Sequence, residues 1–209
     1  MKIKIRRAAA CLIMLLVVSL GVALTLKAAV GVGAWDAFGQ SVSNLSGIKV
    51  GTVTMLLNFA CVLIELIILR GKFGISQFMQ IVISAVIGVG VNFFYYDVLG
   101  SLVLRDYPVR VAVLLIAYGI NAFAGGCLMM IGLGTFAVEG ACKVIGDRLH
   151  RPFHVLRQLV DVFCVVICVL LALFLHTPLT VREGSVLGLL VYGPLMGLSV
   201  KLLKPIFQK

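Results

Sequence analysis

The chain has 209 residues, of which 62% are hydrophobic and only 12% are charged, whereas soluble domains carry about 25% charged residues. Its mean hydropathy is strongly positive. These values exclude an ordinary soluble domain and predict an integral membrane protein in contact with the lipid bilayer.

Six apolar runs are long enough to cross a bilayer, which takes roughly 20 apolar residues. They cover about 8–26, 50–69, 77–98, 110–132, 155–175 and 184–202. A helix satisfies its own backbone polar groups in lipid, so we expect an all-α integral membrane protein with six transmembrane helices. The apolar part of the first run, 19 residues long, exceeds the roughly 7–15 residues of a cleaved signal peptide, so we expect a retained helix.

Basic residues are distributed unevenly between the connections. If the spans alternate in direction, 13 Lys and Arg residues fall on one side: Lys2, Lys4, Arg6, Arg7, Arg70, Lys72, Lys143, Arg148, Arg151, Arg157, Lys201, Lys204 and Lys209. The other side receives five: Lys27, Lys49, Arg105, Arg110 and Arg182. This positive-inside pattern predicts a bacterial cytoplasmic membrane protein with both termini in the cytoplasm. The net charge of +10 therefore encodes orientation and does not indicate a nucleic-acid partner.

One irregular, glycine-rich sequence motif, called the repeated phrase below, occurs twice. GVGAWDAFGQ (31–40) follows the first span and GLGTFAVEGA (132–141) follows the fourth. Gly31, Gly33 and Gly39 fall on Gly132, Gly134 and Gly140 at one constant offset, and a two-residue insertion then aligns Asn58 with Asp161 and Cys61 with Cys164. Two glycines around one residue let the backbone leave one helix and enter another at a new angle.

The repeated phrase predicts two halves of three helices each, 1–105 and 106–209. Because three crossings is an odd number, the second half would enter the membrane inverted, as in many secondary transporters. We expect a short Gly-broken helix after spans one and four, in segments 34–46 and 135–150. Two interpretations stay open for these segments: re-entrant helices that dip toward the midplane, or interfacial helices lying flat, with Trp35 as an aromatic anchor.

Polar residues inside the spans are the candidate site. A carboxylate near a helix centre costs about 2.5–3.5 kcal/mol on insertion scales, so Asp161 suggests a function. Arg157 is four residues earlier on the same face, so the two form either a structural ion pair or a substrate or proton site. Asn58 either forms a hydrogen bond to a neighbouring helix or binds a ligand. Together with Asp36 and Glu139 from the repeated phrase, these residues are the predicted substrate-binding set.

Other features predict structure more than chemistry. Glu65 is five residues before Arg70 and is expected to reach the cytoplasmic interface. The six cysteines are interpreted as helix-packing residues, since neither a CxxC motif nor ligand spacing accompanies them. No nucleophile with a base, phosphate-binding loop or zinc-protease motif occurs. We therefore expect neither an enzyme nor a bound cofactor or metal.

The chain resembles the YitT/YczE group of bacterial multi-pass membrane proteins. The resemblance lies in GVALTLKAAVGVGAWDAFGQSVSNLSGIKVGTV (21–53), GLGTFAVEGA (132–141), FHVLRQLVDVFCV (153–165) and VREGSVLGLLVYGPL (181–195). It covers nearly the whole chain, and the paired Gly-rich phrases are its most specific feature. Ala34 stands where relatives place Pro or Ser before the Trp-Asp pair, which makes the local turn less rigid here. The resemblance implies a membrane compartment but no agreed activity and no catalytic residues.

Two functions from different classes agree with these observations. The first is a small secondary transporter or permease for an unknown small solute or ion, in which two three-helix halves rock about the predicted site. The second is a non-transporting membrane subunit or regulator, including the substrate-capture subunit of an energy-coupled importer, with the basic segment 141–157 as docking surface. Whether the chain forms a homo-oligomer or binds a membrane partner stays open at this point.

Overall fold

The computed structural model describes residues 2–70, 74–132 and 135–207, and within these ranges the regular secondary structure is entirely helical. The helices are α1 (Lys2–Ala28), α2 (Ala34–Ser46), α3 (Val50–Leu69), α4 (Ile75–Asn92), η1 (Phe93–Val98), α5 (Tyr107–Ile131), α6 (Ala137–Leu149), α7 (Phe153–Leu175) and α8 (Glu183–Phe207). The element η1 is a π-helical turn that continues α4.

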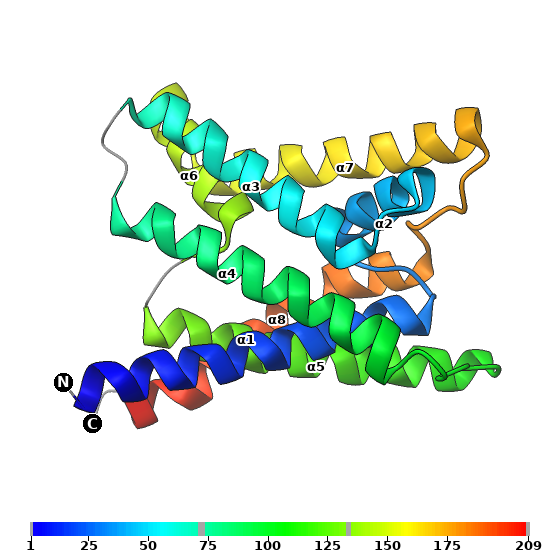
Figure 1. Ribbon diagram of the computed structural model, residues 1–209, viewed down its shortest axis with the longest axis horizontal. Helices are drawn as coiled ribbons and strands as arrows, with labels where there is room; N and C mark the ends of the chain where they lie inside the picture. The colour runs from blue at the N-terminus through cyan, green and yellow to red at the C-terminus, as the bar shows by residue number, and fades with distance from the viewer. Residues whose placement is uncertain (1, 71–73, 133–134, 208–209) are drawn as a thin grey trace.

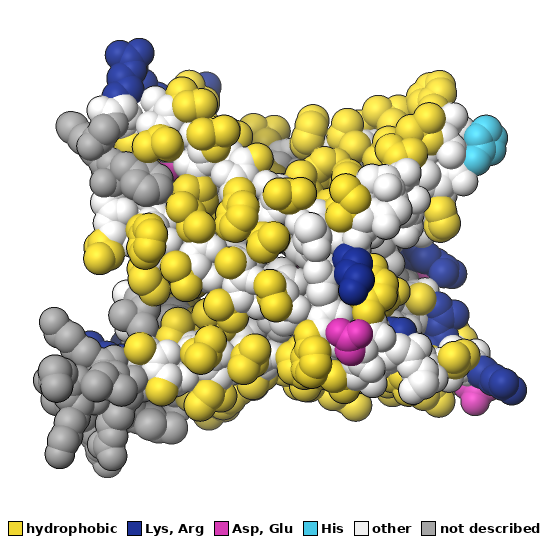
Figure 2. Space-filling view, viewed as in Figure 1, with side chains coloured by type: hydrophobic (Ala, Val, Ile, Leu, Met, Phe, Trp, Pro, Cys, Tyr) yellow, Lys and Arg dark blue, Asp and Glu magenta, His cyan; other side chains and the backbone are white. Residues whose placement is uncertain are grey.

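Six of these helices are long and apolar enough to cross a membrane, which confirms the predicted spans. They cover Arg7–Ala28, Val50–Leu69, Ile75–Val98, Tyr107–Ile131, Phe153–Leu175 and Glu183–Lys204. Figure 2 shows hydrophobic side chains over most of one face, with basic side chains toward its two ends. Large apolar side chains of α7, among them Leu159 and Phe174, are exposed, as a lipid-facing helix requires.

The long helices form two groups, and the short helices α2 and α6 pack against the group that contains α3 and α7. In Figure 1, α3 and α7 run along the top, while α1, α5 and α8 lie below, and α4 crosses between. Helix α1 packs against α4 and α5, α5 against α8, and α3 against α4. The short helix α2 packs against α3 and α7, and α6 packs against α3, α4 and α7. The two short helices lie at opposite ends of the molecule, α6 at the left and α2 at the right (Figure 1).

Helices α3 and α4 approach closely at a pair of glycines. A Cβ on Gly51 would lie 2.2 Å from the Gly88 carbonyl oxygen, so a larger side chain would force the helices apart. Next to this contact, the Asn92 Oδ1 atom accepts a hydrogen bond from the Gly51 amide at 2.9 Å, and the Tyr96 hydroxyl accepts one from the Val50 amide at 3.2 Å. The first amides of α3, which have no partner in their own helix, are therefore satisfied by α4 and η1.

The break between α1 and α2 is held by residues of the second half. The Arg110 guanidinium donates to the carbonyls of Ala28, at 2.7 Å, and Ala29, and Arg182 donates to Ala29 at 3.2 Å. The Gly184 amide donates to the Val30 carbonyl at 2.9 Å. The last carbonyls of α1, at the negative end of the helix dipole, thus receive two cationic donors.

Gly31 is required at this break for two reasons. Its φ angle is +120°, a conformation that L side chains rarely adopt, and an added Cβ would lie 2.9 Å from the Ser185 amide nitrogen. The sequence-based interpretation of this glycine as a backbone break is confirmed by this geometry. The close approach of α8 is the part that sequence alone did not indicate.

Candidate substrate-binding site between the short helices

The candidate site lies beside the first turns of α2 and α6, which both pack against α3 and α7. Trp35 of α2 packs against a buried cluster shared by α3 and α6, which consists of Cys61, Val62, Ala137, Val138, Ala141 and Cys142. Phe136, just before α6, packs in turn against a core cluster that contains Ala37 of α2. The Trp35 indole nitrogen is buried and has no hydrogen-bond partner among the described residues. This packing differs from an interfacial anchor, whose indole would face the lipid headgroups.

Each short helix carries an acidic residue at its third position. Asp36 is in the first turn of α2 and Glu139 is in the first turn of α6. A carboxylate at this position is stabilised by the positive end of the helix dipole and by free backbone amides. Both helix starts therefore carry a carboxyl group.

Glu139, Arg157 and Asp161 form one ion-paired group. The Arg157 Nε atom lies 3.7 Å from the Glu139 Oε1 atom, and the Arg157 Nη1 atom donates to the Asp161 Oδ1 atom. The side chains of Arg157 and Asp161 are about one quarter exposed, at 27% and 28%. The Glu139 Oε2 atom is buried without a partner among the described residues. Arg157 and Asp161 are therefore ion-paired, and the sequence-based prediction of either a structural pair or a substrate or proton site stays a prediction.

Asp36 and Asn58 line a small cavity on the other side of the helix starts. The cavity is enclosed by α1, α2, α3 and α4, and its volume is about 20 Å³, enough for about one water molecule. Thr54, one turn before Asn58 on α3, also lines it, together with Gly51 and Gly88 of the helix contact. Oxygen and amide groups therefore face an otherwise apolar space.

Asp36 makes no salt bridge among the described residues, although charged groups act on it. Burial raises the pKa of the Asp36 carboxyl to about 6, the positive charge of Arg157 opposes this shift, and the Glu139 carboxylate adds to it. Burial likewise raises the pKa of Glu139, against the opposing effect of Arg157. The two carboxyl groups and the guanidinium are thus close enough to influence one another's charge.

The five predicted site residues fall into two adjoining sets. Asp36 and Asn58 face the cavity, while Glu139, Arg157 and Asp161 form the ion-paired group. Sequence reasoning missed Thr54, although its spacing of four residues from Asn58 places both on one helix face.

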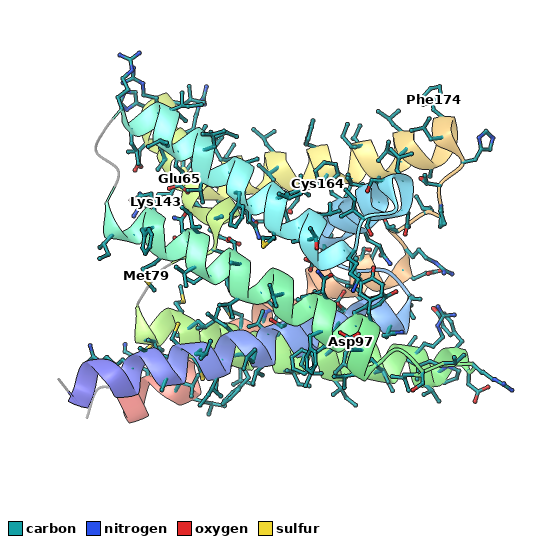
Figure 3. The ribbon with its side chains drawn as sticks, viewed as in Figure 1. Glu65, Met79, Asp97, Lys143, Cys164 and Phe174 are labelled. Carbon is teal, nitrogen blue, oxygen red and sulfur yellow. The ribbon has the colours of Figure 1, made fainter. Side chains whose placement is uncertain are left out.

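The structure corrects one expectation near the site. Glu65 was expected to reach the cytoplasmic interface, yet its side chain is fully buried, with 0% exposed. Its spacing from Arg70 did not reveal that α4 and α6 would cover it. Cys164, one turn after Asp161, is also fully buried and lies on the inner side of α7 (Figure 3).

No metal site was found in residues 2–70, 74–132 and 135–207. Within these ranges, no group of three or more His, Cys, Asp or Glu side chains is arranged to hold a metal ion. The cysteines are all buried and free.

Residues 5–201 match the model of a family described as a family of unknown function, DUF6198. The chain therefore belongs to this family. It is also 26% identical over 194 residues to the uncharacterized protein YyaS of Bacillus subtilis strain 168, a match that covers 87% of this chain and 90% of that protein. No solved structure matches the chain. These comparisons agree with a multi-pass membrane protein of unknown function, and the YitT/YczE resemblance stays a prediction beside them.

Proposed function

We propose that this member of the DUF6198 family is a small secondary transporter or permease of the bacterial cytoplasmic membrane, not an enzyme. Its solute or ion would bind at the cavity between α1, α2, α3 and α4, beside the ion-paired group of α6 and α7. The observation that carries the proposal is the Asp36 carboxyl, which faces a small, mostly apolar cavity and has no salt-bridge partner among the described residues. A carboxylate in that position favours a solute with a cationic group.

The helix bounds support an inverted repeat as the basis of transport. Several bounds in the second half lie 103 residues beyond their counterparts in the first: Ala28 and Ile131, Ala34 and Ala137, Ser46 and Leu149, Val50 and Phe153. At the same spacing, Asp36 corresponds to Glu139, Thr54 to Arg157 and Asn58 to Asp161. The site would then consist of three equivalent pairs of residues, one member of each pair from each half.

This spacing revises how the repeated phrase is aligned. The sequence comparison matched Gly31 with Gly132 and introduced a two-residue insertion further on. With the helix bounds as reference, Gly31 corresponds to Gly134, and no insertion is needed between Ala28 and Asn58. A glycine in a helix break is recognisable from sequence, but its register is set by where the following helix begins.

Packing between the halves supports rocking about a common centre. Helix α2 packs against α7 and α6 packs against α3, so each short helix contacts a long helix of the other half. With both termini in the cytoplasm, as the positive-inside pattern predicts, α2 would enter from outside and α6 from the cytoplasm. Alternating access would then open one short helix while the other stays closed over the solute.

Ligand-dependent thermal stability of the detergent-purified protein tests the proposal. A ligand that binds only the folded protein raises its melting temperature by mass action, so a panel of amines, metabolites and ions should contain at least one solute that gives a saturable shift. The shift should be lost in Asp36→Asn and retained in Asp147→Asn, which changes an exposed carboxylate on α6.

The pH dependence of that shift provides a second readout. A cation needs the ionised form of Asp36, and the pKa of this group is raised to about 6. Cation affinity should therefore be full above about pH 7 and fall by about tenfold for each pH unit below 6. If no solute shifts the melting temperature at any pH, transport by this site is contradicted, and a membrane partner becomes the function to pursue by copurification from native membranes.

A further inference from the structure

Glu65 and Gln80 form a buried carboxyl–amide pair between α3, α4 and α6. Their side chains are 0% and 2% exposed. The Gln80 Nε2 atom donates to the Glu65 Oε2 atom at 3.4 Å and to the hydroxyl of Thr135 at 3.4 Å. Thr135 is exposed, so a polar contact leads from the buried pair to the surface.

Two oxygen atoms of this pair lack a hydrogen-bond donor. Both Glu65 Oε1 and Gln80 Oε1 are buried and have no hydrogen-bond partner among the described residues. An ionised carboxylate only accepts hydrogen bonds, and a side-chain carbonyl also only accepts. A protonated carboxyl group, in contrast, can accept from an amide N–H through one oxygen and donate to the amide carbonyl through the other. One proton on Glu65 supplies the donor that both oxygens lack.

We propose that Glu65 is a proton-binding site, in which the carboxyl group is protonated at neutral pH and paired with the Gln80 side-chain amide. The proton sits on Oε1 of Glu65 and is donated to Oε1 of Gln80, while Oε2 of Glu65 accepts from Nε2 of Gln80. An ionised Glu65 in the same place would be a buried charge without a compensating cation, which is strongly unfavourable.

The groups around Glu65 agree with a neutral carboxyl. On its own helix, Cys61 lies one turn before it, and Arg70 at the end of α3 is exposed. Helix α4 contributes the Gln80 side-chain amide, which carries no charge. Helix α6 carries Lys143, which lies toward the same end of the molecule (Figure 3) and is exposed. Among the described residues, no Lys, Arg or His forms a salt bridge with Glu65.

Helix α6 rests directly on the pair through Gly140. A Cβ at this position would lie 2.3 Å from the Gln80 Nε2 atom and 2.4 Å from the Glu65 Oε1 atom, so only glycine allows the contact. The preceding residue, Glu139, belongs to the candidate site. If the chain transports a solute as proposed above, loss of the Glu65 proton would weaken the packing of α6 against the Glu65–Gln80 pair. Proton release would then be linked to opening of the cytoplasmic side.

Infrared spectroscopy of the purified protein tests the proton site without any transport assay. The carbonyl stretch of a protonated carboxyl group is separate from the carboxylate bands and shifts in D2O. At pH 7 the wild type should show one such band that is missing from Glu65→Gln, a variant that keeps the shape and neutrality of the protonated side chain. Glu183→Gln, which changes a carboxylate whose side chain is 62% exposed, should retain the band.

A second variant tests the pairing itself. In Gln80→Leu the band should remain but move to higher frequency, because the carboxyl group loses its acceptor. Identical bands in the wild type and Glu65→Gln would overturn the proposal. A band whose frequency is the same in Gln80→Leu as in the wild type would also overturn it. A wild-type protein with no protonated-carboxyl band at pH 7 overturns it whatever the variants do. Because the band reports the proton alone, its presence or absence is independent of whether any solute is carried.

Discussion

The two short helices place the same chemical group in different surroundings. Asp36 and Glu139 each follow two residues after their helix begins. Glu139 is paired with Arg157, whose guanidinium also binds Asp161, whereas Asp36 faces a cavity lined by the uncharged side chains of Thr54 and Asn58. Glu139 therefore has a cationic partner inside the protein, whereas Asp36 has no salt bridge among the described residues.

This difference separates two roles that the sequence could not tell apart. A carboxylate with an internal cation stabilises the packing of its helix and gains little from a solute. A carboxylate without one is costly to ionise inside the protein, and a bound cation or proton removes that cost. Within the proposed site, we therefore expect changes at the ion-paired group to affect folding as well as ligand binding, and changes at Asp36 to affect mainly ligand binding.

Arg157→Gln should have the largest effect on stability. It removes the cation shared by Glu139 and Asp161 and leaves two carboxylates near Asp36. Breaking a buried pair costs about 3–5 kcal/mol, and since these side chains are about one quarter exposed, we expect about 3 kcal/mol. Chemical denaturation of the purified protein measures the loss.

Two further variants control for this effect. Arg105→Gln changes an exposed arginine in the connection before α5 and should alter the free energy of unfolding by less than about 0.5 kcal/mol. Combining Arg157→Gln with Asp161→Asn should restore part of the stability, because one unpaired charge is removed. A double variant no more stable than Arg157→Gln alone would contradict the ion-pair explanation.

Gly31→Ala should destabilise the protein by about 2 kcal/mol, since a non-glycine residue is held in a sparsely populated backbone conformation and its Cβ would lie 2.9 Å from the Ser185 amide nitrogen. Gly119→Ala is the matched control, because a Cβ at Gly119 meets nothing within 4 Å. Thermal unfolding of the two variants, measured side by side, gives the difference. Equal melting temperatures would mean that the α1–α2 break tolerates a side chain.

Ser41→Ala should have the smallest effect, about 1 kcal/mol. The Ser41 hydroxyl is 2.7 Å from the Thr180 hydroxyl, which also donates to the Ala37 carbonyl at 3.0 Å, so the change loosens α2 from the connection between α7 and α8. Ser46→Ala removes an exposed hydroxyl of the same helix, which donates to the Val42 carbonyl and accepts from the Ile48 amide, and should cost less than about 0.5 kcal/mol because these bonds are open to solvent. If the two variants lose the same stability, the buried hydroxyl pair contributes nothing special to α2.

The membrane spans and the short helices could be predicted because their signals are local. A run of apolar residues gave 50–69 for the helix observed at Val50–Leu69, and the segment 34–46 matches α2. The positions of Asp36 and Glu139 at the helix starts follow from the same pattern. What the sequence could not provide was the surroundings, since burial of Glu65 depends on α4 and α6 packing over it.

Two local details also depended on distant contacts. The π-helical turn at Phe93–Val98 has no sequence signal of its own, and its Tyr96 hydroxyl accepts from the first residue of α3. Arg110 and Arg182 were interpreted only as part of the charge count, but they bind the carbonyls at the end of α1. Residues far apart in the chain supply these contacts, so no window of sequence contains both partners.

The anchoring of the α1–α2 break has a consequence for biosynthesis. The carbonyls of Ala29 and Val30 receive donors from Arg182 and Gly184, which are made after most of the chain has left the ribosome. The first break therefore cannot reach its final hydrogen bonding until the last helix begins to enter the membrane. Nascent chains that stop before that point should expose the break to quality-control proteases, and arrival of the first residues of α8 should be the step that completes its hydrogen bonding.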